Sequence, residues 1–128
     1  MKNKIGYSVG KLKEANTRLE DGLSTVKDDL GIDGVIQRFE FTFELLWKTF
    51  KVFLEDKGIL CHSPKDCLKA AFKYGLITDE QIFIKMLDDR NILSHVYDLK
   101  QSRDIFDRIK KDYFESISTT IKTIESHS

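Results

Sequence analysis

The sequence predicts an all-α protein, folded as an antiparallel, up-and-down four-helix bundle with one extra short helix. Three observations support this prediction. Apolar residues recur at helical spacing in four long segments, no segment sustains the alternation typical of a strand, and the 128 residues include one proline. A chain of this length, with 41% hydrophobic residues, suits one undivided core, so we expect a single domain over residues 1–128.

The first helix is expected from about Lys4 to Leu30. Its stripe has one polar member and steps by four and three residues in turn: Ile5, Val9, Leu12, Asn16, Leu19, Leu23, Val26 and Leu30. This spacing places the stripe on one face of a helix. Gly31 then suits the end of that helix, and Asp33 suits the cap of the next one.

The second helix is expected from about Gly34 to Lys57, with Gly58 as its terminator. Its stripe again steps by four and three residues: Phe39, Phe43, Leu46, Phe50 and Phe53. Further apolar side chains widen this surface: Phe41, Leu45 and Val52. A helix this apolar is predicted to lie at the centre of the core, with its phenylalanines serving as core residues rather than as a platform for stacking bases.

Two further helices have clear starting signals. Ser63 followed by Pro64 is typical of an N-cap and a first helical residue. These residues predict a short helix from Pro64 to about Tyr74, which Gly75 would end. Residues Thr78 to Gln81 then have the capping-box pattern that starts another helix.

The last helix is expected to begin after Asp98, which can cap it, and to run to about Glu125. Its apolar stripe has helical spacing: Phe106, Ile109, Tyr113, Ile117, Ile121 and Ile124. Short connections between successive helices favour antiparallel packing of neighbours.

Composition and charge exclude several classes of protein. The 21 basic and 21 acidic residues give a formal net charge of zero, which argues against nucleic-acid binding by bulk charge but not against a local cationic site. No apolar run approaches the roughly 20 residues of a membrane span, and no apolar segment of the signal-peptide kind follows Met1 to Lys4. We therefore expect a cytoplasmic protein that does not contact membranes.

The cysteines and histidines do not form a recognisable metal-binding or cofactor-binding pattern. Cys61 and Cys67 are expected to be reduced thiols, because two cysteines without a secretion signal are more often free than bridged. No histidine follows a glutamate at the Glu-x-x-His spacing of di-iron bundles, and Cys61, His62 and Cys67 lack an obvious fourth zinc ligand. No glycine-rich phosphate loop occurs. We expect no metal ion and no cofactor.

The segment from Asp88 to Asp98 clusters polar residues where the fourth helix should still be apolar. Three of its side chains suit phosphate chemistry. Arg90 offers a fixed fork of donors to a phosphate, and His95 can exchange protons near neutral pH. Tyr97 adds a hydroxyl that can donate, accept or be modified. This segment is therefore the candidate functional site.

Helix geometry constrains how these residues can meet. Arg90, Ser94 and Tyr97 share one face of an ideal helix, whereas His95 points about 140° away from Arg90. Arg90 and His95 meet only if the helix bends or ends near His95, or if a second copy of the chain lies alongside. A two-fold dimer would place both motifs in one cleft. The residues alone favour a simpler interpretation, a helix end with a surface Arg–Asp pair and a capping histidine.

Residues Arg90 to His95 match the Arg-x4-6-His motif of HEPN domains, and Tyr97 completes the form Arg-x4-His-x-Tyr. The chain therefore resembles the HepT-type HEPN proteins encoded beside a minimal nucleotidyltransferase of the MntA type, a group also described as nucleotidyltransferase substrate-binding proteins. The resemblance covers about Leu12 to Ile121. It also rests on three other stretches: residues 38–48, Ser63-Pro64 and residues 70–72.

The resemblance implies an all-α bundle that forms a homodimer, with the two motifs facing each other across the interface. It also implies a metal-independent endoribonuclease that acts as a toxin. The nucleotidyltransferase would be its antitoxin and would transfer AMP to Tyr97. RNA or a nucleotide would bind at the dimer cleft. An alternative description of the same proteins is a non-catalytic subunit that binds the substrate or nucleotide of a two-component nucleotidyltransferase.

In the ribonuclease interpretation, His95 is the expected proton carrier and Arg90 the group that stabilises the charged transition state. Asn91 and Ser94 would add hydrogen bonds. An AMP group on Tyr97 would bring an anion that competes with RNA phosphate for Arg90. A helical interaction module with no active site is a third alternative.

The second helix carries a charged series whose members are four residues apart, Glu40, Glu44 and Lys48. Such residues can pair in series along one helix. The pattern favours a solvated or interface face over a pair of catalytic carboxylates, because charge series of this kind are common on exposed helices.

Overall fold

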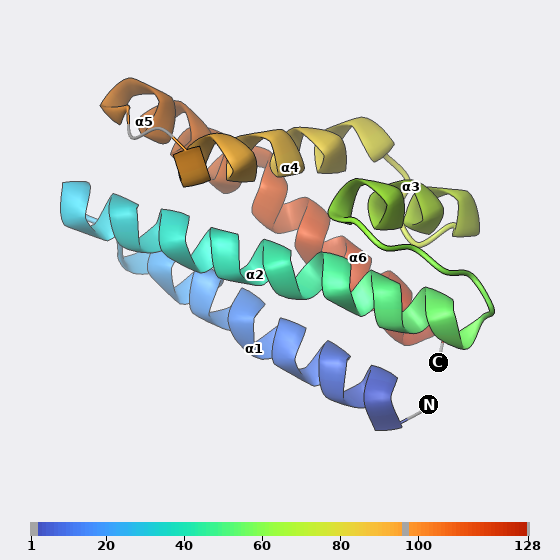
Figure 1. Ribbon diagram of the computed structural model, residues 1–128. Coiled ribbons are helices and arrows are strands. Elements are labelled where there is room, and N and C mark those ends of the chain that lie inside the picture. The colour runs from blue at the N-terminus through green and yellow to red at the C-terminus, as the bar shows by residue number, and fades with distance from the viewer. Residues whose placement is uncertain (1–2, 96–97, 128) are drawn as a thin grey trace.

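The computed structural model describes residues 3–95 and 98–127, and within these ranges every regular element is helical. In chain order the elements are α1 (Asn3–Thr25), α2 (Asp29–Asp56), α3 (Pro64–Tyr74), α4 (Glu80–His95), α5 (Leu99–Arg108), the π-helical segment η1 (Ile109–Tyr113) and α6 (Phe114–Ser126) (Figure 1). The all-α prediction is confirmed. No helix in the described ranges is long and apolar enough to cross a membrane.

Helices α1 and α2 run side by side in opposite directions (Figure 1). The turn between them comes earlier than the sequence suggested. Asp28 caps α2, its Oδ1 accepting a hydrogen bond from the Gly31 amide at 2.9 Å. Gly31 therefore lies inside α2 rather than ending α1, and Asp33 caps nothing. The expected extension of α1 to Leu30 is wrong, because a satisfied aspartate cap fixes the helix start and glycine is tolerated inside it.

Helix α2 supplies the centre of the core. Its expected stripe is buried at 0–1% exposure: Phe39, Phe43, Leu46, Phe50 and Phe53. The α1 stripe is buried from Ile5 to Leu19, and Asn16 within it donates to Ser118 Oγ of α6 at 2.9 Å. Two expected core residues are outside: Leu30 is 80% exposed and Phe41 is 59% exposed. Phe41 lines an open pocket between α1 and α2 together with Ala15 and Arg18.

The starts of α3 and α5 agree with the capping signals, whereas α4 begins one residue later than a capping box at Thr78 predicts. Ser63 caps α3 and Gly75 ends it with φ +99°. At α4 the capping side chain is Asp79, whose Oδ1 accepts from the Ile82 amide at 3.3 Å. Asp98 caps α5, as expected, by accepting from the amides of Lys100 and Gln101 at 2.9 and 3.3 Å. Short polar side chains thus set each start by satisfying amides that the helix leaves unpaired.

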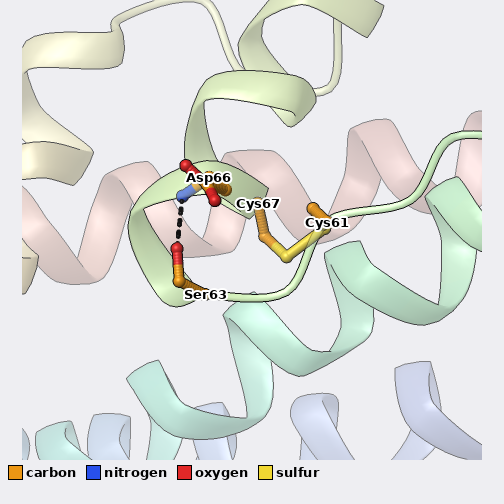
Figure 2. The surroundings of a disulfide bond; sticks show 4 residues. All are labelled: Cys61, Ser63, Asp66 and Cys67. Carbon is orange, nitrogen blue, oxygen red and sulfur yellow. Dashed lines mark hydrogen bonds between the residues drawn. A yellow bond between two sulfur atoms is a disulfide. The ribbon is translucent and has the colours of Figure 1, made fainter.

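A disulfide bond joins Cys61, in the connection from α2 to α3, to Cys67 in the first turn of α3 (Figure 2). The expectation of reduced thiols at these positions is wrong. Ser63 Oγ accepts from the Asp66 amide at 3.2 Å and turns the chain into α3 between the two cysteines. Their Cα atoms consequently lie 5.1 Å apart, within the separation that a disulfide can span. Both cysteines are buried, so the bridge fixes the start of α3 against the core.

The last helical stretch contains one π-helical turn, η1, between α5 and α6. No pattern in the sequence predicted this turn. Consecutive core residues here are four apart and all are buried: Ile109, Tyr113, Ile117 and Ile121. Four-residue steps overshoot one turn of an α-helix by about 40° each. One wider turn takes up the excess, and the expected stripe keeps facing the core.

Candidate functional site

Arg90 lies on α4 and faces α2. Its side chain is 32% exposed, and its Nη2 forms an ion pair with Glu44 Oε2 at 2.8 Å. The other carboxylate oxygen of Glu44 lies 3.5 Å from Lys48 Nζ. Glu44 therefore lies between two cations, and one edge of the Arg90 guanidinium is held while the rest of this partly exposed group remains available to a ligand.

The two expected supporting residues contact Arg90 in different ways. Asn91 Oδ1 accepts from Arg90 Nη1 at 3.4 Å, a long hydrogen bond. The Ser94 hydroxyl donates to the backbone carbonyl of Arg90 at 3.1 Å. The proton of Ser94 is thus used within α4, and only the lone pairs of its oxygen are left for another donor.

His95 is the last residue of α4, but its side chain lies outside what the structure describes. Tyr97, the expected modification site, lies outside the described residues altogether. The structure consequently brings Arg90, Asn91 and Ser94 together on one stretch of α4.

Two glutamates of α2 belong to this site, although the sequence favoured a solvated or interface face. Glu44 binds Arg90, and Glu40 lies one helical turn away and is half-buried. Burial raises the pKa of the Glu40 carboxyl, while the charge of Arg90 lowers it. The expected pairing along α2 is confirmed for Glu44 with Lys48. The four-residue spacing of Glu40 and Glu44 places them on one face of α2, but it does not show that Arg90 of α4 lies opposite.

Asp89 precedes Arg90 and anchors α4 to the last helices. It is fully buried and accepts hydrogen bonds from Arg108 Nε and Nη2 at 2.8 and 2.9 Å and from the Tyr113 hydroxyl at 2.5 Å. The ring of Tyr113 stacks on Phe39 of α2, with centroids 5.5 Å apart. With Asp89 held inward, the next side chain, Arg90, is turned about 100° away, toward α2.

Both donors to Asp89 have raised pKa values. Hydrogen bonds to Asp89 raise the pKa of the Arg108 guanidinium. Burial, together with the hydrogen bond to Asp89, raises the pKa of the Tyr113 hydroxyl, which therefore remains a donor. Three hydrogen bonds thus converge on the buried Asp89 carboxyl and satisfy its oxygens.

Among residues 3–95 and 98–127, no group of three or more His, Cys, Asp or Glu side chains is placed to hold a metal ion. Cys61 and Cys67, which the sequence analysis considered with His62 as an incomplete set of zinc ligands, are bonded to each other. The chemistry of the described site therefore centres on one arginine, its two carboxylate neighbours and the polar residues of α4.

A family model described as nucleotidyltransferase substrate binding protein like matches residues 7–126, almost the whole chain. The chain belongs to this family. A curated relative from Haemophilus influenzae, named probable ribonuclease HepT, is 37% identical over 98 residues. The matched segment covers 73% of this chain and 66% of that relative, so the chain spans just under two thirds of the relative's length.

Solved structures of similar fold extend the family comparison. A Thermus thermophilus protein is 31% identical, with a TM-score of 0.79, and the match covers 88% of this chain and 98% of that one. A tri-AMPylated HEPN toxin of Shewanella oneidensis, solved in complex with an MNT antitoxin, has a TM-score of 0.79 and covers 98% of this chain and 99% of its own. At 20% identity, the second match shows a common fold alone.

Proposed function

We propose that this chain is the HEPN subunit of a two-component system with a minimal nucleotidyltransferase, and that it is a metal-independent endoribonuclease toxin. The observation that carries the proposal is the Arg90 guanidinium, held at 2.8 Å by Glu44 and 32% exposed at the motif Arg-x4-His-x-Tyr. The family membership and the curated HepT relative support it. Arginine in this setting suits a phosphate diester, because its remaining donors match phosphate oxygens.

In the proposed reaction, His95 removes the proton of an RNA 2′-hydroxyl, and the resulting oxygen attacks the adjacent phosphorus. The bond from phosphorus to the 5′ oxygen breaks, and that oxygen takes up a proton from an imidazolium. The products are a 2′,3′-cyclic phosphate and a 5′-hydroxyl. Arg90 stabilises the extra negative charge on the phosphorane oxygens. General acid–base catalysis of this kind contributes about 10²- to 10⁴-fold.

The proposal includes a homodimer of up-and-down four-helix bundles, in which α3 is the extra short helix. Arg90 and His95 diverge by about 140° on a straight helix, so a second copy is a direct way to complete the site. A two-fold axis beside α4 would bring two arginines and two histidines to one cleft. Local charge of this kind is compatible with a chain whose formal net charge is zero.

Regulation would act at Tyr97. The partner nucleotidyltransferase would transfer AMP from ATP to the Tyr97 hydroxyl and release pyrophosphate. The AMP phosphate would then compete with RNA for Arg90, which blocks cleavage. The Shewanella toxin, which carries AMP groups in complex with its antitoxin, motivates this part of the proposal.

The family description favours a second candidate function, a subunit that binds the substrate of the nucleotidyltransferase and cleaves nothing. Arg90 would then hold a nucleotide phosphate. Cleavage of RNA by the purified dimer in the presence of a chelator separates the two functions. In the ribonuclease proposal, Arg90→Ala and His95→Ala each lower the cleavage rate at least about 100-fold.

Lys85→Ala is the matched control, since Lys85 is an exposed cation on the same helix. It should cleave RNA at the wild-type rate. If folded Arg90→Ala and His95→Ala proteins cleave like the wild type, the ribonuclease proposal is wrong. Binding of nucleotide without cleavage by the wild type selects the second function. A shared site is tested by mixing the two inactive variants, because hybrid dimers regain activity only if one subunit's Arg90 works with the other's His95.

A further inference from the structure

A pocket of about 230 Å³ opens between α2, α4 and α5, on the side of α2 that carries Glu40. Its lining residues come from all three helices: Asp33, Ile36, Gln37, Glu40, Leu93 and Ser102. Leu93 follows Arg90 by three residues, so it lies on the neighbouring turn of α4. Glu40 lies close enough to Arg90 to feel its charge. A ligand whose phosphate binds Arg90 would therefore reach this pocket with the group next to that phosphate.

The size and walls of the pocket suit one flat ring. Its volume is below the roughly 300 to 1,000 Å³ of pockets that enclose drug-sized ligands, so it would hold one base rather than a whole nucleotide. The buried side chain of Ile36 and the half-buried Leu93 give apolar surface from opposite helices. Apolar side chains can stack against a base face, whichever base it is.

The polar groups of the pocket are mainly acceptors. Asp33 is already paired with Arg103, whose Nη1 lies 3.2 Å from Asp33 Oδ1. Ser102 donates its hydroxyl proton to the Leu99 carbonyl at 2.9 Å and accepts from Arg103 Nη1 at 3.2 Å. Ser102 therefore has no proton to offer a ligand.

Glu40 is the pocket carboxylate with no hydrogen bond to any residue in the described ranges. It is half-buried and within reach of the charge of Arg90, and its oxygens are free to accept N–H donors from a ligand. Phosphate is a poor match for this acidic pocket, whereas the edge of a base is neutral. Guanine presents two adjacent N–H donors that match the two oxygens of one carboxylate. Uracil presents one N–H flanked by carbonyl oxygens, which would face the carboxylate.

We propose that this pocket binds the nucleobase adjacent to the phosphate held by Arg90, and that Glu40 selects a base with an amino donor edge, guanine above uracil. The inference rests on the proposed function for the phosphate at Arg90. It adds a specificity-determining residue on α2, outside the Arg-x4-His-x-Tyr motif. Gln37 at the rim can donate or accept, so it can pair with whichever base edge remains.

The test measures binding separately from cleavage. Short RNAs that differ in one central base, G or U, carry a 2′-deoxy sugar there and a fluorescent end label, so that they bind without being cut. Anisotropy titration should give wild-type binding about tenfold tighter for G than for U, the order expected of one bidentate pair. Glu40→Gln, which replaces one acceptor oxygen with a donor, should bring the two affinities to within about twofold. Glu55→Gln, at the far end of α2, should keep the tenfold preference.

The two proposals fail in different ways. Equal binding of G and U by the wild type, or an unchanged preference in Glu40→Gln, overturns the base pocket. If cleavable RNAs are still cut in that case, the ribonuclease proposal stands without the pocket. If no RNA is cut but the G preference depends on Glu40, the pocket stands and the ribonuclease proposal fails. Circular dichroism of each variant shows that the comparison is made on folded protein.

Discussion

Glu44 of α2 and Arg90 of α4 form a 2.8 Å ion pair across 46 positions of sequence. The pair fixes one edge of the guanidinium of Arg90, and Lys48 lies on the other side of the carboxylate. A phosphate that binds Arg90 must share it with this carboxylate. Glu44 is therefore expected to position Arg90 rather than to take part in proton transfer.

The first prediction concerns Glu44→Gln. Without the carboxylate, Arg90 loses the group that fixes its position. It also loses an anion that competes with RNA phosphate for its N–H donors. We expect kcat for RNA cleavage to fall about 10- to 100-fold, because small misplacements of a catalytic group carry costs of this order. KM should stay the same or fall. Steady-state kinetics on a short RNA gives both constants.

Glu55→Gln is the control for that experiment, since Glu55 pairs with Lys4 at 3.6 Å at the other end of α2. It should leave both constants unchanged. An increase in KM with constant kcat in Glu44→Gln would contradict a positioning role and would indicate that Glu44 helps to bind RNA.

The second prediction is a pH dependence of stability that originates at Glu40. Burial raises the pKa of this carboxyl above its ordinary value of 4.5, more than Arg90 lowers it. The folded state therefore favours the protonated carboxyl. The stability contributed in this way is fully present below pH 4.5 and is lost as the pH rises through the higher folded-state pKa.

Glu40→Gln removes that titration and should gain stability relative to the wild type as the pH rises. Urea unfolding at pH 4 and at pH 7 measures the difference in free energy of unfolding between the two proteins. The advantage of the variant should be larger at pH 7. A difference that is equal at both pH values would contradict the prediction by showing that burial and Arg90 cancel at this carboxyl. A difference that is larger at pH 4 would show that Arg90 stabilises the charged carboxylate more than burial disfavours it.

The third prediction concerns the buried carboxylate beside the site. Arg108→Met leaves Asp89, which is 0% exposed, without its two guanidinium hydrogen bonds. Removing one partner of a buried pair typically lowers stability by about 3 to 5 kcal/mol. Lys111→Met removes the same charge from an exposed position and should change stability by less than about 0.5 kcal/mol. Similar losses in both variants would mean that net charge, rather than the buried pair, matters.

Local patterns were sufficient to predict most of the helices. The core stripe of α2 and the cap at Ser63 depend on spacing and on side chains that satisfy nearby amides, and both are found where expected. The α1–α2 turn was predicted too late in the chain, because Gly31 suits a helix end and Asp33 suits the cap of the next helix. Asp28 suits such a cap equally well. Only the hydrogen bond from the Gly31 amide to Asp28 decides between them.

Contacts between distant segments were harder to predict. The sequence singled out Arg90, but nothing local indicates that Glu44 lies opposite, since the pair depends on how α2 packs against α4. The disulfide likewise depends on the path of the loop. A spacing of six residues between Cys61 and Cys67 is compatible with free or bonded thiols until the turn at Ser63 brings them together.

The last prediction uses this disulfide. Cys61–Cys67 closes a short loop and restricts the unfolded chain, so Cys61→Ala/Cys67→Ala should lower the free energy of unfolding by about 2 kcal/mol. Dithiothreitol should destabilise the wild type and have no effect on the double variant, which has no sulfur to reduce at these positions. Thermal unfolding with and without reductant measures both effects. If native wild-type protein shows two reactive thiols and unfolds at the same temperature with and without dithiothreitol, the bridge does not stabilise the fold.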